Sequence, residues 1–252
     1  MLLAIDVGNS NTVLGIFRGS ELVCQWRIST SREKTADEYS VLLRQLFHSA
    51  SIEFSQIQKV VISSVVPPLN ERLAAMCKSH YACAAIFVEP AQQELLPVRY
   101  QPISDVGADR VVTAIAALES FAPPLIVVDF GTAITFDAVA GDGSYLGGVI
   151  APGLGISAEA LFQRASRLPR IEIRKPDRVI GSSTIGSMQS GLFYGYVGLV
   201  EGILERMLAE LEAASIIATG GLAQLIASEI PKISYVDENL MLHGLRIYAE
   251  RI

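Results

Sequence analysis

The sequence Asp6-Val7-Gly8-Asn9-Ser10-Asn11-Thr12 follows a short apolar run, and a related sequence, Asp129-Phe130-Gly131-Thr132, follows a second apolar run. Placing Asp129 on Asp6 also places Gly131 on Gly8 and Thr135 on Thr12, and both segments continue toward a hairpin turn, at Gly19-Ser20 and at Asp142-Gly143. Chance matches one Asp-x-Gly string more readily than it matches the string, the threonine and the hairpin together. We therefore interpret the two segments as an internal duplication of a strand-turn-strand-turn-strand unit.

The remainder of each half alternates between expected strands and helices, which is typical of an α/β protein. The first half predicts a strand at 59–64, and the second half predicts one at 215–219. Expected helices cover 37–49, 69–79, a segment capped by Ser104-Asp105 and running to 119, 184–211, and 239 to the end. A boundary near Ala122-Pro123-Pro124 predicts two domains, 1–121 and 122–252.

The composition limits the classes of function. Half of the 252 residues are hydrophobic and 18% are charged, which predicts a folded chain with a sizeable core. The net charge of -6, without a basic block, argues against nucleic-acid binding. The sequence contains no run of about 18 uncharged apolar residues, so no membrane-spanning helix is expected. Three scattered cysteines fit a reducing, cytoplasmic compartment.

The two turns have the chemistry of a phosphate site. Gly8 lets the backbone approach a ligand, and successive N–H groups can point at a phosphate. Asp6 at the strand end can hold Mg²⁺, directly or through water. If the two halves face one cleft, Asp6 and Asp129 lie near the same polyphosphate, and cations must bridge the like charges. The alternative is a polar hairpin turn without a ligand.

A third segment, Gly107-Ala108-Asp109-Arg110, stands at an expected helix start. Asp109 could accept the proton of a hydroxyl group during phosphoryl transfer. Arg110 could hold a carboxylate or a phosphate by paired hydrogen bonds. The alternative is that Asp109 only complements the helix dipole, and the segment alone leaves both interpretations open.

Glycines mark two further places. Gly220-Gly221 either lets adenosine lie against the backbone or forms a plain turn between strand and helix. On the long expected helix, four glycines share one face and favour close packing, either within the chain or in a dimer; they are Gly191, Gly195, Gly198 and Gly202.

The duplicated Asp-x-Gly unit resembles the ATPase superfamily of actin, heat-shock chaperones and sugar kinases. Within it, the chain resembles the type III pantothenate kinases over nearly its whole length. The matching strings are 6–12, 107–110, 129–133, Thr184-Ile185-Gly186-Ser187 and Gln189-Ser190-Gly191. The resemblance implies duplicated ribonuclease H-like (actin-like ATPase) domains with mixed sheets flanked by helices. It implies transfer of the ATP γ-phosphate to pantothenate, the first step of coenzyme A biosynthesis.

The resemblance also implies roles for individual residues. Asp109 would be the catalytic base, and Asp129 would bind a monovalent cation, K⁺ or NH₄⁺, beside Mg²⁺ with ATP. The implied ATP contacts are Asp6, Val7, Gly8, Asn9, Ser10, Asn11, Thr12, Val13 and Thr132. The implied pantothenate contacts are Tyr100, Gly107, Ala108, Asp109, Arg110 and Thr184. A cytoplasmic homodimer is implied as well, whereas the absence of nucleic-acid and membrane partners is the expectation from charge and hydropathy given above.

Two other functions compete with this one. The chain could be another small-molecule phosphotransferase of the superfamily, or a non-catalytic regulatory accessory protein. The presence of Asp6, Asp109 and Asp129 together argues against lost catalysis. Pantothenate-dependent turnover of ATP separates these alternatives.

Overall fold

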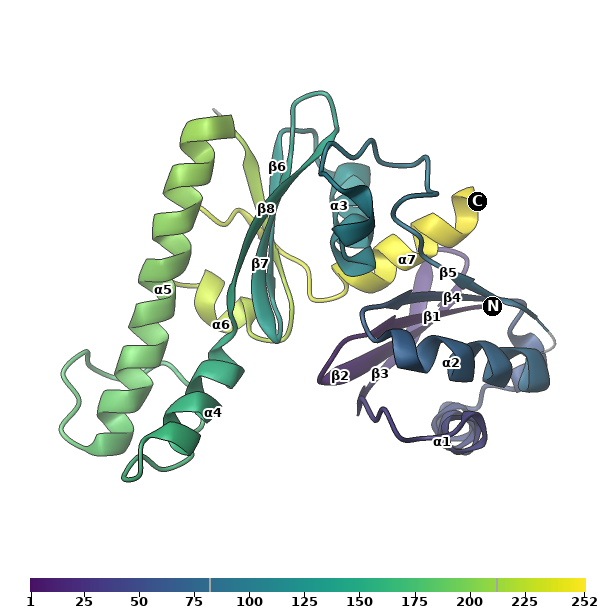
Figure 1. The fold of residues 1–252 in the computed structure, drawn as a ribbon, viewed down its shortest axis with the longest axis horizontal. Coiled ribbons are helices and arrows are strands. Elements are labelled where there is room, and N and C mark those ends of the chain that lie inside the picture. The colour runs from purple at the N-terminus through teal and green to yellow at the C-terminus, as the bar shows by residue number, and fades with distance from the viewer. Residues whose placement is uncertain (82, 212) are drawn as a thin grey trace. The chain divides into compact units, whose positions relative to one another are not determined.

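The computed structural model describes residues 1–81, 83–211 and 213–252, which divide into two compact units (Figure 1). The first unit contains Met1–Glu119 together with Leu240–Ile252, and the second contains Ser120–Asn239. The first division lies two residues before the boundary expected at 121/122. The last helix was expected in the second domain, 122–252, but it packs in the first unit.

A five-stranded mixed sheet forms the centre of the first unit. Its strands are β1 (Leu2–Val7), β2 (Asn11–Arg18), β3 (Glu21–Ser29), β4 (Lys59–Ser64) and β5 (Ala85–Phe87), in the order β3-β2-β1-β4-β5. The first three strands are antiparallel neighbours, and β4 and β5 continue the sheet in parallel. The central strands β1 and β4 are almost continuous apolar runs because both of their faces are buried.

Helices cover both faces of this sheet (Figure 1). The helices α1 (Ala36–Ser49) and α2 (Pro67–His80) lie on one side, and α7 (Leu240–Arg251) lies on the other and contacts β1, β2 and β4. Thr35 and Glu38 form a reciprocal capping box that begins α1. The core below the sheet joins side chains of β1, β2 and β4 to α1 and α2. The helix α3 (Ala108–Ser120) packs closely on α7, where Gly244 approaches the carbonyl of Val112.

The second unit repeats this sheet. Its strands are β6 (Leu125–Phe130), β7 (Ala133–Val139), β8 (Tyr145–Pro152), β9 (Ser215–Thr219) and β10 (Tyr235–Val236), in the order β10-β9-β6-β7-β8. The helices α4 (Leu154–Arg164), α5 (Thr184–Leu211) and α6 (Ala223–Ala227) accompany it. Phe193, Tyr196, Val200 and Leu204 of α5 are buried against β6, β7 and β9 in one core. The α/β class and the duplication of the sheet are thereby confirmed.

The strand registers correct the overlay of the two halves. Asp6 pairs with Val13 across β1 and β2, whereas Asp129 pairs with Thr135 across β6 and β7. The second turn is therefore one residue shorter, so Thr135 takes the place of Val13 rather than that of Thr12. The constant offset between the two halves therefore fails after the turn, because the loss of one residue from the turn shifts the residue that pairs with the aspartate by one position.

The start of α3 also differs from its expected place. Residues Ile103–Asp105 form a 3-10 turn closed by the bond from Val106 N to Ile103 O, and Val106 is extended. The helix begins only at Ala108, so Ser104-Asp105 is not its N-cap. An extended residue after the turn breaks the run of helical dihedral angles, which moves Asp109 into the first helical turn.

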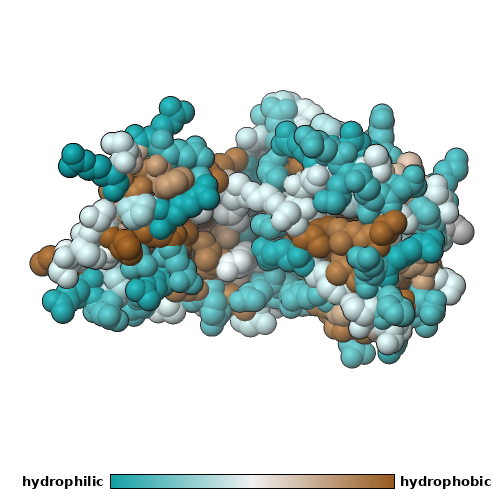
Figure 2. Space-filling view, turned by 90° about the horizontal axis from the view of Figure 1, so that it is seen from below, coloured by the Kyte–Doolittle hydropathy of each residue, from teal (hydrophilic) through white to brown (hydrophobic). Residues whose placement is uncertain are grey.

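On the face shown in Figure 2, the surface is largely hydrophilic and its apolar areas form separate patches. Among the described helices, none is long and apolar enough to cross a membrane.

Candidate active site

The first Asp-x-Gly turn joins β1 to β2 and is held by hydrogen bonds from both sides. Gly8 N donates to Asn11 O at 3.0 Å, which closes the turn. The Thr30 hydroxyl donates to Gly8 O at 2.7 Å and lies 2.9 Å from the hydroxyl of buried Thr12. Thr30 N donates to Ser10 O at 3.0 Å. The end of β3 therefore fixes the turn while Asn9, Ser10 and Asn11 stay exposed.

Asp6 lies near the end of β1, just before this turn, and has a pairing partner on each neighbouring strand. It faces Val13 on the antiparallel side and Ser63 on the parallel side. The Ser63 side chain is fully buried, and its hydroxyl has no hydrogen-bond partner among the described residues. Asp6 and Ser63 thus place two oxygen donors at neighbouring positions at the ends of parallel strands, which suits a hydrated cation.

The second turn is held by close backbone packing. Gly131 N donates to Ala133 O at 3.1 Å, and Gly153 N donates to Thr132 O at 3.0 Å. A Cβ atom at Gly153 would lie 2.3 Å from Thr132 O. A Cβ atom at Gly220, where φ is +95°, would lie 2.4 Å from Asp129 Oδ1 and 2.7 Å from Phe130 N. Both positions require glycine because backbone atoms occupy the space of a side chain.

Asp129 is half-buried, and its cross-strand neighbours carry hydroxyl groups. Thr135 faces it on the antiparallel side and buried Thr219 on the parallel side. This set matches Asp6 with Ser63 in the first unit, and it offers oxygen ligands of the kind that hard cations prefer.

The segment from Gly107 to Arg110 forms the first turn of α3. Asp109 Oδ1 accepts the backbone N–H of Arg110 at 2.8 Å. A Cβ atom at Gly107 would lie 2.3 Å from the same oxygen, so glycine gives the carboxylate its space. Burial raises the pKa of Asp109, while the Arg110 N–H and its guanidinium oppose the rise. Arg110 is itself 8% exposed and lies beside this carboxylate.

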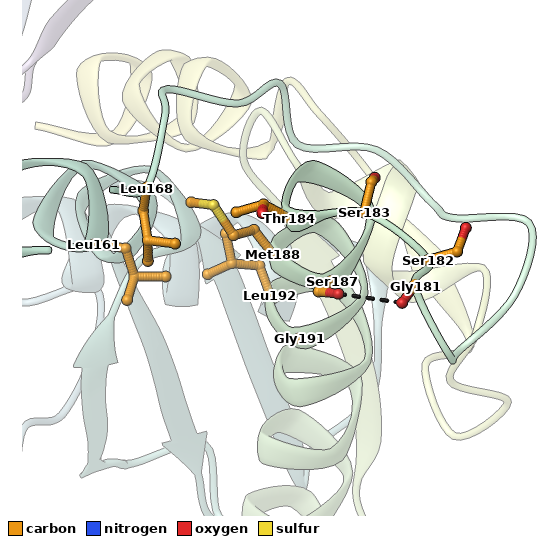
Figure 3. Close-up of a pocket in the computed structure, with 10 residues that line it drawn as sticks. All are labelled: Leu161, Leu168, Gly181, Ser182, Ser183, Thr184, Ser187, Met188, Gly191 and Leu192. Carbon is orange, nitrogen blue, oxygen red and sulfur yellow. Dashed lines mark hydrogen bonds between the residues drawn. The ribbon is translucent and has the colours of Figure 1, made fainter. Parts of the chain in front are cut away.

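Thr184 begins α5 and lines a cavity of about 840 Å³ in the second unit. Figure 3 shows Leu161 and Leu168 on one side of it and the α5 side chains of Thr184, Met188 and Leu192 on the other. The cavity offers apolar walls with serine hydroxyls at one end, at Ser182, Ser183 and Ser187. Such a lining suits a small molecule that combines alkyl groups with hydroxyls and amides.

The predicted residues fall into two sets. Residues 6–13, 107–110 and half-buried Tyr100 belong to the first unit, whereas Asp129, Thr132 and Thr184 belong to the second. Each turn is assembled as expected inside its own unit. The shared cleft between the halves stays a prediction.

Sequence reasoning missed the residues that support the two turns. They are Thr30, Ser63, Gly153 and Thr219. Gly220 was noted, but as a surface for adenosine, and in this unit it contacts Asp129. The repeat held a signal for two of them, because Ser63 and Thr219 end the strands that follow the duplicated hairpins.

Comparisons with solved structures define the class of the fold. A protein described as a Baf family transcriptional activator from Campylobacter jejuni matches with a TM-score of 0.61 and 22% identity, over 98% of this chain and 97% of that one. A protein described as a 2-dehydro-3-deoxygalactonokinase from Sinorhizobium meliloti matches with a TM-score of 0.59 and 13% identity, over 100% and 97%. The fold is the duplicated ribonuclease H-like fold of the actin-like sugar kinases.

Sequence comparisons narrow the class to one family. The family model of type III pantothenate kinases matches residues 2–206. Type III pantothenate kinases from Koribacter versatilis and Myxococcus xanthus are 50% and 53% identical over 100% of this chain, and the matches cover 96% and 98% of those proteins. The chain belongs to the type III pantothenate kinases. It phosphorylates pantothenate in coenzyme A biosynthesis, using ATP and a divalent metal ion.

Proposed function

We propose that the first turn, residues Asp6 to Val13, binds the ATP phosphates together with Thr132, and that Asp109 is the base acting on the pantothenate hydroxyl. One observation carries the proposal: both units present an Asp-x-Gly turn at the same point of a duplicated sheet. Asn9, Ser10 and Asn11 are exposed, and short polar side chains together with the backbone N–H groups of such a turn suit a phosphate chain.

The position of Asp109 supports its role as base. The carboxylate of Asp109 is held by the Arg110 N–H, and the absence of a side chain at Gly107 leaves room for it. Burial raises the pKa of Asp109, so the carboxylate holds a proton more strongly than an exposed one would. A more basic carboxylate is a better proton acceptor for an alcohol during transfer.

The remaining substrate contacts follow from the chemistry of pantothenate. Its carboxylate suits the guanidinium of Arg110, which can form two parallel hydrogen bonds. Gly107 and Ala108 bring backbone close to the substrate, and Tyr100 adds an aromatic ring with a hydroxyl. Thr184 contributes from the large cavity at the start of α5. The first unit thus offers a cation at Arg110, and the cavity of the second unit offers hydroxyls and apolar walls.

The cations are expected to lie between the turns and the nucleotide. Within residues 1–81, 83–211 and 213–252, no three acidic, histidine or cysteine side chains are grouped as a dedicated metal cage. Single carboxylates such as Asp6 fit Mg²⁺, which commonly binds phosphates, waters and one or two carboxylates. When bound, Mg²⁺ neutralises developing charge on the phosphates. We assign K⁺ or NH₄⁺ to Asp129, where Thr135 and Thr219 add oxygen atoms.

We infer that the enzyme is a homodimer formed through the glycine face of α5. Among the described residues, none apart from neighbours in α5 itself lies within 4 Å of a Cβ atom built at Gly195 or Gly198, so this smooth face is open there. Replacing Gly198 by arginine is expected to shift the protein to monomer in sedimentation experiments. Gly141→Arg, in an equally open turn, is the control. An unchanged mass in the Gly198 variant would exclude this interface.

We also propose a cytoplasmic location. All three cysteines are free, and Cys77 is buried. Burial raises the pKa of the Cys77 thiol to about 12, which keeps it protonated and unreactive. Fractionation of cells followed by detection of the native chain tests the location.

The decisive experiment measures coupled ADP release with and without pantothenate, in potassium and in sodium buffers. We expect turnover only with pantothenate, and faster turnover in potassium. Turnover that ignores pantothenate would favour another phosphotransferase of the superfamily. Full activity in sodium alone would remove the cation from Asp129.

A further inference from the structure

The second unit contains a concentration of positive charge that the composition of the whole chain conceals. Residues 164–178 include six of the 20 basic residues and only two acidic ones, Glu172 and Asp177, in a chain with a net charge of -6. The basic residues of this segment are Arg164, Arg167, Arg170, Arg174, Lys175 and Arg178.

The second half of this basic segment lines a polar cavity of about 360 Å³. One side of the lining is formed by residues 174–178. The other side lies at the beginning of α5 and is formed by Gly181, Ser182, Ser183, Ile185, Gly186 and Gln189. Three cations, Arg174, Lys175 and Arg178, therefore line one side of the cavity. Asp177 is the acidic member of the lining.

The loop that precedes α5 is fastened to the helix by hydrogen bonds. The hydroxyl of Ser190 donates to Val179 O, and that of Ser187 donates to Gly181 O at 3.3 Å, the bond drawn in Figure 3. A Cβ atom at Gly181 would lie 2.4 Å from Ser187 N, so the loop rests directly on the helix. The side of the cavity formed by residues 181–189 is therefore held in place by bonds within the chain.

The cations differ in how far they are neutralised. Lys175 forms an ion pair with Glu229 at 2.7 Å, and Arg170 pairs with Glu159 outside the cavity. Within the described part of the chain, neither Arg174 nor Arg178 has a hydrogen bond or an ion pair, and both are exposed. Two guanidinium groups are therefore available on the same wall to an anion from solution.

We propose that this cavity binds a phosphate group, held by the guanidinium groups of Arg174 and Arg178. Paired N–H donors of arginine match phosphate oxygens in geometry as well as in charge. The start of the 28-residue helix α5 adds a favourable dipole. The ligand is inorganic phosphate or a small phosphorylated molecule, and both share the phosphate dianion.

The test measures phosphate binding by calorimetry and phosphorus NMR while saturating pantothenate and a non-hydrolysable ATP analogue with Mg²⁺ fill the proposed substrate sites. The double variant Arg174→Gln/Arg178→Gln is compared with Arg164→Gln/Arg167→Gln, which removes the same charge from the same segment outside the cavity. Separate titrations with inorganic phosphate, pyrophosphate and phosphopantothenate distinguish the sources. Circular dichroism verifies that both variants fold.

We expect the first double variant to bind phosphate at least tenfold more weakly than the wild type, and the second to bind it unchanged. The tightest of the three probes identifies the source of the phosphate. Equal weakening in both variants would reduce the site to a diffuse charge effect and overturn the proposal. No saturable binding of any probe to the wild type would overturn it as well.

Discussion

The two Asp-x-Gly turns occupy equivalent points of a duplicated sheet, yet they keep their shape by different means. The first turn is held by hydroxyl and backbone hydrogen bonds from Thr30. The second is one residue shorter and, in addition to its own backbone hydrogen bonds, rests against Gly153 and Gly220, where backbone atoms fill the space of a side chain. Hydrogen bonds can lengthen to admit a ligand, whereas backbone in van der Waals contact cannot yield without a shift of the strand.

This difference fits a division of labour between the units. The first turn exposes three polar residues in succession, which suits a ligand with many oxygen atoms such as a polyphosphate. The second turn exposes only Gly131 and Thr132 and fixes Asp129 firmly, which suits a single ion. Duplication supplied two copies of one turn, and the supporting residues made them different.

The largest expected effect comes from a residue that the duplication does not repeat. The helix α3 follows β5 as α7 follows β10, but only α3 has an acidic residue in its first turn, Asp109. We expect Asp109→Asn to lower turnover by about 10²- to 10⁴-fold because the base is lost. Binding of the ATP analogue should stay within about twofold of the wild type. Wild-type turnover in the variant would remove Asp109 as the base.

Alanine substitutions compare the rigidity of the two turns directly. Gly220→Ala combines a strained φ of +95° with contact to backbone at 2.7 Å, so we expect a loss of about 3 kcal/mol in unfolding free energy. Gly8→Ala places its Cβ 3.0 Å from Asn11 O at an ordinary φ and should cost about 1 kcal/mol. Urea unfolding measures both, with Gly141→Ala as the neutral control. Equal losses at the two turns would contradict the difference in support.

Cation dependence separates the two aspartates. Asp129→Asn should abolish the stimulation by potassium, with an effect of about tenfold on turnover, because one charge-assisted contact to the ion is lost. Asp6→Asn should lower turnover while leaving the ratio of rates in potassium and sodium unchanged. The measurement is ADP release in the two buffers. A ratio that changes only in the Asp6 variant would reverse the assignment.

The smallest effect concerns stability and pH. The folded protein raises the pKa of Asp109 above 3.8, so ionising this group opposes folding. That cost is absent below the pKa of the unfolded chain and complete above the raised value. Asp109→Asn should therefore unfold at a higher temperature than the wild type at pH 8, and at the same temperature near pH 3. Thermal scans across pH measure this difference. A wild type that is more stable than the variant at pH 8 would contradict the raised pKa of Asp109.

The sequence predicted the elements of the fold well where long apolar patterns decide them. The strands 59–64 and 215–219 and the helix 184–211 are found at their expected limits. The predictions failed where the local conformation of a few residues decides the outcome, at the start of α3 and in the second turn. At Ser104-Asp105, capping chemistry suggested a helix start, but the 3-10 turn and extended Val106 intervene. One deleted residue in the second turn was equally invisible, because a fixed offset cannot register a change in loop length.

The site was predictable only as far as its side chains carry chemistry of their own. Asp6 and Asp129 could be named because the repeat places a carboxylate at the end of each duplicated strand, whereas Asp109, which could equally complement the helix dipole, was named as a base from the family resemblance. Gly153 could not be named, because its role depends on the position of Thr132 O in space. Arg174 and Arg178 were concealed by the acidic balance of the whole chain.

The placement of α7 has a consequence for the order in which the chain is made. Lys59 reaches the carbonyl of Ala249, and α7 covers β1, β2 and β4, which are among the first strands to be synthesised. During translation, this face of the first sheet stays uncovered until residue 251 has left the ribosome. The second unit is complete at residue 239 and can finish folding earlier. The half that begins first is therefore the half that finishes last.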